Sequence, residues 1–152
     1  MLDFLEHFPY RQTKAILSEC WRVLCPNGEL VIQVPDAEHL LYALAQRGSY
    51  LCNRCGEQMH RNRVSPSEPI ENFRLCPRCE QSADEISDAA MMRLYGGQDY
   101  PGNFHHTCFT KGSLLRIADE TGFRIVEQLE RDHQYKNWNF KVRFRKGDPW
   151  QT

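Results

Sequence analysis

The sequence has little net charge, no long apolar run and no signal-peptide pattern. Its 19 basic and 20 acidic side chains give a formal net charge of -1, so the charge balance predicts neither a polyanion-binding surface nor an acidic tail. Its apolar runs are far shorter than the roughly 20 residues of a membrane-spanning helix. The first four residues, Met-Leu-Asp-Phe, lack the basic and apolar regions of a secretory signal. We therefore expect a soluble, cytoplasmic protein that does not act at a membrane.

A disulfide framework is also unexpected, although the chain contains seven cysteines. Four of them form two C-x-x-C pairs, and Cys20, Cys25 and Cys108 remain. An odd number of remaining thiols suits a reducing compartment better than a set of disulfides.

The two cysteine pairs predict a metal site. Cys52 and Cys55 form the first pair, and Cys76 and Cys79 form the second. Zinc binds four thiolates at tetrahedral corners, and each C-x-x-C turn supplies two of them. Such a closed shell is structural, because it leaves no position for water or substrate. A redox dithiol is the alternative, but a thioredoxin-like site has a single pair that opens a helix after a strand.

Basic residues accompany the cysteines. Four thiolates and one Zn²⁺ carry a net double negative charge, which nearby arginines can offset. The sharper alternative is a surface that binds nucleic acid or protein, although four glutamates interleave with the arginines. The arginines are Arg54, Arg61, Arg63, Arg74 and Arg78, and the glutamates are Glu57, Glu68, Glu71 and Glu80.

Hydrophobic periodicity around the cysteine segment predicts alternating helices and strands. Asp36 and Thr110 are predicted N-caps, as is Ser82 or Asp84, and glycines at 96 and 122 are predicted helix stops. The helices are expected over residues 10–24, 37–46, about 84–95 and 111–121, and the strands over residues 29–34, 123–130 and 138–145. Leu40, Leu41 and Leu44 are the expected buried stripe of the second helix, and the Met91-Met92 pair is expected in the core.

Each strand presents one apolar and one largely polar face, so we expect helices mainly on one side of the sheet. Residues 1–48 and 82–146 then form the main domain. Residues 49–81 form an inserted zinc-binding subdomain, and residues 147–152 a flexible tail.

Several segments outside the insert share a pattern with one family. They are Leu5-Glu6-His7-Phe8-Pro9, residues 21–28 (WRVLCPNG), the strand at 29–34 with Pro35, residues 93–98 (RLYGGQ), Phe104-His105-His106 and Thr121-Gly122-Phe123. In this order they resemble the C-terminal half of a class I S-adenosylmethionine-dependent methyltransferase. The resemblance implies a truncated Rossmann-like α/β fold of about three strands. The strands at 29–34, 138–145 and 123–130 would correspond to the family's fifth, seventh and sixth, side by side in that order with the seventh antiparallel.

The chain departs from this family at the methyl-donor site. It contains no G-x-G-x-G loop and no carboxylate placed to hold the ribose, and Gly96-Gly97 lies in the wrong place to replace them. Strand 29–34 would then lie at an open edge of the sheet. We expect a second copy to pair with it in a homodimer, or a separate donor-binding chain to cover it. As a further alternative, residues 1–4 could fold back as a remnant of the family's fourth strand.

Three functions fit these observations. The leading hypothesis is a methyltransferase-derived, zinc-binding half domain that is inactive alone and acts as a homodimer or in a complex. The second is a methyltransferase completed by a partner that brings S-adenosylmethionine, with Glu6, His7, His105 and His106 lining the acceptor pocket and one of them taking a proton. The third is a zinc-ribbon module for nucleic acid or protein.

The candidate acceptor-pocket residues also have a simpler interpretation. His7 would pack at a helix start, and His105 and His106 would lie on an exposed loop. Cys108, which follows the histidine pair, could instead be a thiol nucleophile or a ligand of a second metal site, although no orienting carboxylate is evident from the sequence.

Overall fold

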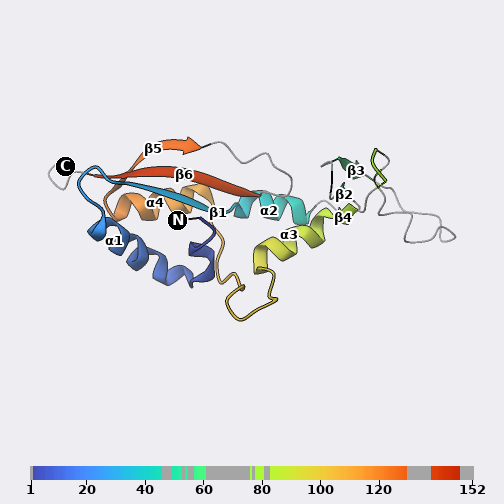
Figure 1. Cartoon of the computed structure of the whole chain (residues 1–152), viewed down its shortest axis with the longest axis horizontal. Coiled ribbons are helices and arrows are strands. Elements are labelled where there is room, and N and C mark those ends of the chain that lie inside the picture. Colours follow the sequence, from blue (N-terminus) through green and yellow to red (C-terminus); the bar gives the residue numbers. More distant parts are fainter. Residues whose placement is uncertain are drawn as a thin grey trace.

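The computed structural model describes residues 2–45, 49–52, 54, 57–60, 76, 78–80, 83–129 and 138–147. These residues form a mixed α/β structure with a three-stranded antiparallel main sheet, a second small sheet and four α-helices (Figure 1). No helix among them combines the length and the apolar character needed to cross a membrane.

The main sheet has the predicted strand order. It consists of β1 (Glu29–Pro35), β6 (Asn139–Lys146) and β5 (Phe123–Leu129), in the order β1-β6-β5. β6 runs antiparallel to both neighbours, so β1 and β5 are parallel to each other. A register shift between Ile125 and Glu127 interrupts the β5–β6 ladder. It ends the strict alternation predicted for β5, in which Ile125 and Val126 are both exposed.

The N-terminal segment folds back along the sheet, as predicted. Leu2 forms an isolated parallel bridge with Gln33 of β1, and the Asp3 amide donates to the Gln33 carbonyl at 3.1 Å. Two 3₁₀ turns follow, η1 (Leu5–His7) and η2 (Tyr10–Gln12). This return places η1 beneath β1, with Leu5 fully buried in the core.

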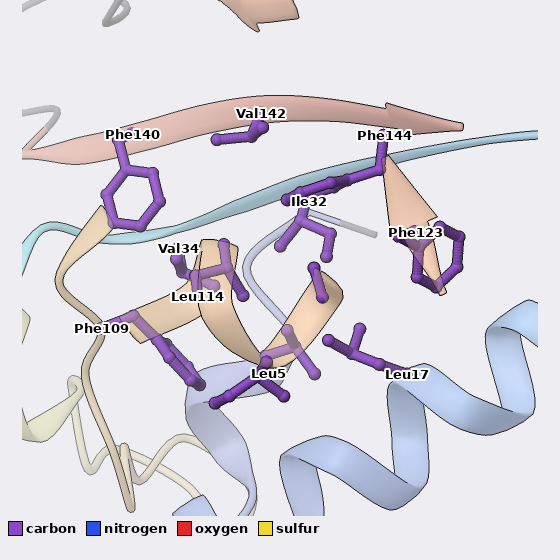
Figure 2. Packing of buried hydrophobic residues seen from close by; sticks show 12 residues of the cluster. Leu5, Leu17, Ile32, Val34, Phe109, Leu114, Phe123, Phe140, Val142 and Phe144 are labelled. Atoms are coloured by element: carbon purple, nitrogen blue, oxygen red, sulfur yellow. The ribbon is translucent and has the colours of Figure 1, made fainter. Parts of the chain in front are cut away.

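Helices cover one face of the main sheet, as the strand pattern predicted (Figure 1). α1 (Thr13–Val23) and α4 (Lys111–Glu120) lie on that face, and Thr110 caps α4 in a reciprocal capping box with Ser113. Apolar side chains from β1, β6 and these helices point toward one another between the two layers (Figure 2). The core side chains include Leu5, Leu17, Ile32, Val34, Phe109, Leu114, Phe123, Phe140, Val142 and Phe144.

A second, smaller hydrophobic cluster joins α2 (Ala37–Leu44) to α3 (Ile86–Tyr95). Asp36 caps α2 as predicted, by accepting from the amides of Glu38 and His39. The predicted stripe is confirmed at Leu40, which is fully buried, and at Leu44, which packs against the cluster. It is wrong at Leu41, which is 63% exposed, because the helix turns Ala43 inward instead.

Two predictions for α3 also fail. Met91 and Met92 are exposed, since the inward positions of this helix are those of Ile86 and Ala90. Asp84 does not cap the helix, because residues 83–85 form a strand and α3 begins only at Ile86. The other predicted cap, Ser82, lies outside the described residues.

The segment around the cysteines contains the small sheet. β2 (Ser49–Cys52) lies between β3 (Gln58–His60) and β4 (Ala83–Glu85), antiparallel to both. β4 leads directly into α3, so the segment is continuous with the α2–α3 pair. Cys55, Arg61, Arg63, Arg74, Glu68, Glu71 and most of the predicted C-terminal tail lie outside the described residues.

Candidate functional site

Three of the four predicted metal ligands lie together. The Sγ atoms of Cys52, Cys76 and Cys79 are all within 4.8 Å of one another, and those of Cys52 and Cys79 are 3.4 Å apart. Two thiolates on one tetrahedral zinc ion lie about 3.8 Å apart, since each Zn–S bond is about 2.3 Å. A disulfide would bring the sulfurs to about 2.05 Å. The cluster therefore has the dimensions of a site that could hold a metal ion, and the fourth predicted ligand, Cys55, lies outside the described residues.

Backbone amides point at two of these sulfurs. The amide of Arg54 donates to Cys52 Sγ and the amide of Arg78 donates to Cys76 Sγ, each at 3.4 Å. The donor lies two residues after the cysteine in both turns, so the two C-x-x-C segments share this local geometry. Amide donors favour the thiolate over the thiol, because they stabilise negative charge on sulfur. This arrangement fits a metal-binding turn.

Two arginines near the cysteines are described, Arg54 and Arg78, and both are exposed. Arg78 forms a 3.6 Å ion pair with Glu57, and both side chains remain substantially in contact with solvent. Such a pair contributes little stability, and the glutamate removes part of the positive charge that a nucleic acid would meet. Among the residues described here, this favours charge balance around the cysteines over a nucleic-acid surface.

A second cluster brings together three of the four predicted acceptor-pocket residues. Glu6 and His7 lie in η1, and His105 lies in the loop between α3 and α4, almost one hundred residues later. One ligand atom from each of the three side chains lies within 4.8 Å of the others. The two imidazole rings meet edge to face with their centroids 4.9 Å apart. The interpretation of His105 as a residue of a wholly exposed loop is therefore wrong, since its ring is half-buried against His7.

Backbone carbonyls orient both rings. His7 Nδ1 lies 3.1 Å from the Phe104 carbonyl oxygen, and His105 Nδ1 lies 2.7 Å from the Arg93 carbonyl oxygen. A carbonyl only accepts hydrogen bonds, so the proton of each neutral ring is on Nδ1 and the lone pair is on Nε2. Burial is the main cause that lowers the pKa of His105, which keeps this ring neutral.

Glu6 is a buried carboxylate without a compensating partner. Its side chain is 1% exposed, and neither carboxylate oxygen has a hydrogen-bond partner among the described residues. Burial is the main cause that raises its pKa from 4.5 to about 7, and the nearby charge of Asp3 acts in the same direction. The backbone amides of Glu6 and Phe4 and the charge of His7 act in the opposite direction.

No family model matches the chain, and no curated protein matches it. The chemistry of its sites therefore has to be argued from its own residues.

His106 and Cys108 do not belong to the second cluster. The His106 side chain is exposed, and its backbone amide donates to the Glu6 carbonyl at 2.7 Å, so this residue contributes to the site through its main chain. Cys108 is half-buried, and burial raises the pKa of its thiol. A thiol with a raised pKa is a poor nucleophile, so the structure gives no support to the nucleophile interpretation.

Sequence reasoning missed the groups that hold the second cluster in place. Gly96 has φ +79°, and a Cβ at this position would lie 2.4 Å from the Asn103 carbonyl oxygen. The loop can therefore fold closely over the end of α3, which brings His105 to the Arg93 carbonyl. The available signal in the sequence is the Gly96-Gly97 pair, which predicts the end of a helix but not the fold of the loop after it.

Proposed function

We propose that this chain is a zinc-binding half domain derived from a class I methyltransferase, without transfer activity of its own, that works as a homodimer or in a complex. The observation that carries the proposal is the topology of the main sheet. β6 lies antiparallel between β1 and β5, and the chain before η1 makes a parallel bridge to the outer side of β1. This is the arrangement expected for the family's fifth, seventh and sixth strands, with a remnant of the fourth beside the fifth.

The donor site is the part that these 152 residues do not supply. Their nine glycines include no G-x-G-x-G sequence, the loop whose backbone would approach the methyl donor. Gly96 and Gly97 instead lie against Asn103, in the loop after α3. Transfer activity would accordingly need a donor-binding surface that lies outside these 152 residues.

The cysteine cluster supplies the zinc-binding part of the proposal. A Zn²⁺ ion bound by Cys52, Cys76, Cys79 and the remaining member of the first pair, Cys55, would join the end of β2 to the turn that precedes β4. β2 and β4 are short, and two-strand contacts of this size are marginal in water without a cross-link. The metal would therefore stabilise the small sheet and take no part in catalysis.

The outer edge of β1 is where we place the partner. The Lys146 amide donates to the Gly28 carbonyl, next to the first residue of β1. In an antiparallel pair, residues that hydrogen-bond to the partner strand alternate with residues that do not, so the even-numbered residues of β1 bond to β6. The backbone groups of Glu29 therefore face away from β6. Leu2 and Asp3 lie beside Gln33, so the Glu29 end borders no strand on this side in the described residues.

The uncovered face of the sheet gives a second reason for an assembly. Glu29 pairs with Arg145 at 2.9 Å and with Arg143 at 3.9 Å, and Arg143 also contacts Glu127 at 3.5 Å. These ion pairs extend across β1, β6 and β5 on the face opposite the helices, which is the face that a missing half domain would cover.

The test is the mass of the assembly in solution together with its zinc content and donor binding. We expect one zinc ion in the cysteine site of each chain, a dimer or a larger complex, and no heat on adding S-adenosylmethionine to the purified chain. Glu29→Pro removes the outward amide and is expected to weaken a homodimer. Glu29→Ala is the matched control, because it removes the same carboxylate and keeps the amide. Tight one-to-one binding of the donor to the isolated chain would reject the proposal.

A further inference from the structure

We propose that Glu6, His7 and His105 form a second metal site, separate from the cysteines, that binds a divalent transition-metal ion such as Zn²⁺ or Co²⁺. The three side chains already place one ligand atom each within 4.8 Å of the others. This site goes beyond the proposed function, because neither the zinc-bound cysteines nor the sheet edge involves these residues.

The tautomers of the two histidines suit metal binding. The Phe104 and Arg93 carbonyls accept from Nδ1 of His7 and His105, at 3.1 and 2.7 Å. Each Nε2 then presents a lone pair. Metal-binding histidines use this same arrangement, in which a carbonyl or carboxylate fixes the ring and the opposite nitrogen binds the ion.

Glu6 supplies the independent observation. It is a carboxyl group that is 1% exposed, next to two imidazoles, and the described residues offer its oxygens no hydrogen bond. A buried carboxyl group stays ionised at low cost only when it is paired, hydrogen-bonded or bound to a metal, and is otherwise protonated. A cation between Glu6 and the two imidazoles would bind one carboxylate oxygen and the lone pair of each ring.

The backbone holds these ligands in register. The amides of His106 and Thr107 both donate to the Glu6 carbonyl, at 2.7 and 3.2 Å, and the His105 amide donates to the Tyr95 carbonyl at 3.0 Å. The loop that contains His105 is therefore hydrogen-bonded directly to η1, which contains Glu6 and His7. A site assembled from two distant segments in this way needs little reorganisation to bind an ion.

Two imidazole nitrogens and one carboxylate oxygen define the class of metal. This mixed set suits Zn²⁺ and neighbouring first-row divalent ions better than Mg²⁺ or Ca²⁺, which prefer oxygen ligands alone. In tetrahedral zinc sites with bonds of about 2.0–2.1 Å, ligand atoms lie about 3.3 Å apart, so the three side chains would close by roughly 1.5 Å at most. Three protein ligands also leave a coordination position open to water, unlike the four-cysteine site.

The number of bound ions tests the proposal on the full chain. After one equivalent of Zn²⁺, which the thiolates bind first, a titration with Co²⁺ is expected to show a second ion per chain by calorimetry and elemental analysis. The ring ¹⁵N signals of His7 and His105 should shift or broaden in the same titration. Glu6→Gln and His105→Gln are expected to weaken this second ion about tenfold or more. His106→Gln is the matched control, because its exposed ring lies outside the cluster, and it should leave the affinity unchanged.

A zinc-loaded wild-type chain that binds no second ion overturns the proposal, and this measurement does not depend on whether any variant folds. The proposal also fails if Glu6→Gln and His105→Gln bind the second ion as tightly as the His106→Gln control. A cluster in which Glu6 only exchanges a proton with a histidine would give this result. Neither outcome changes the zinc content of the cysteine site, so failure here is distinguishable from failure of the proposed function.

Discussion

The substitution Glu6→Gln should change how the stability of the protein depends on pH. In the folded chain, burial raises the pKa of Glu6 from 4.5 to about 7. A raised pKa in the folded state means that the unfolded chain releases its proton first as the pH increases. The wild-type protein is therefore expected to lose stability, relative to Glu6→Gln, as the pH rises from about 4.5 through about 7. Below this window both side chains are neutral and the two proteins should behave alike.

The magnitude follows from the difference between the two pKa values. Each unit corresponds to about 1.4 kcal/mol, so a pKa that moves from 4.5 to about 7 gives about 3.5 kcal/mol. This value already includes the charge of Asp3, which raises the pKa, and that of His7, which lowers it.

Urea unfolding of both proteins at pH 5, 6, 7 and 8, with one equivalent of zinc, measures this difference. The cysteines are identical in the two proteins, so the pH dependence of their zinc binding cancels. Glu120→Gln is the control that should give a constant difference over this range, because hydrogen bonds from Lys14 and Arg116 lower the pKa of Glu120 from 4.5 and its contribution is lost only at lower pH. A wild-type minus Glu6→Gln difference that stays within about 0.5 kcal/mol from pH 5 to 8 would refute the reasoning.

Four further predictions concern other parts of the molecule. Removing zinc with a chelator, or Cys76→Ser, should abolish amide protection in β2 and β4, measured by hydrogen exchange; unchanged protection would contradict a structural metal. Gly96→Ala should cost about 1–3 kcal/mol in urea unfolding, because φ is +79° and the new Cβ would meet the Asn103 carbonyl. Phe144→Ala should lower the free energy of unfolding in urea by about 3–5 kcal/mol, because Phe144 is 1% exposed in the main core. Thr110→Ser should preserve the α4 cap, whereas Thr110→Ala should lower the free energy of unfolding in urea by about 1 kcal/mol.

Much of the main sheet could be predicted from the sequence because its signals are local. Phe140, Val142 and Phe144 alternate with Lys141 and Arg143, and a period of two fixes which face of a half-exposed strand is buried. The strand order came from the family resemblance, not from this periodicity. The bulge in β5 could not be predicted, because its cause lies in the pairing with β6 and the local sequence contains no glycine that would mark it.

The helices α2 and α3 were predicted less well because they bury narrow stripes. Leu41 and Leu44 are equally apolar in sequence, yet only the faces that α2 and α3 turn toward each other are buried. The same limit applies to the candidate sites. The two C-x-x-C pairs predicted that Cys52, Cys76 and Cys79 lie together, because a metal ion bound by four thiolates requires this spacing within each pair. No spacing rule connects Glu6 with His105, because their contact depends on the fold of the loop after α3.

α3 physically links the two candidate metal sites. It begins directly after β4, beside the cysteines, and its last turn provides the Arg93 carbonyl that orients His105. Between these ends, Ile86 and Ala90 pack on Leu40 and Ala43 of α2 in a hydrophobic cluster of their own. This cluster fixes α3 without help from a metal, and the loop after the helix is fastened separately to η1 through the Glu6 carbonyl. The Glu6 cluster therefore depends on the packing of α2 and α3 and on the fold of the N-terminal segment, and it should persist when the cysteines lose their ion.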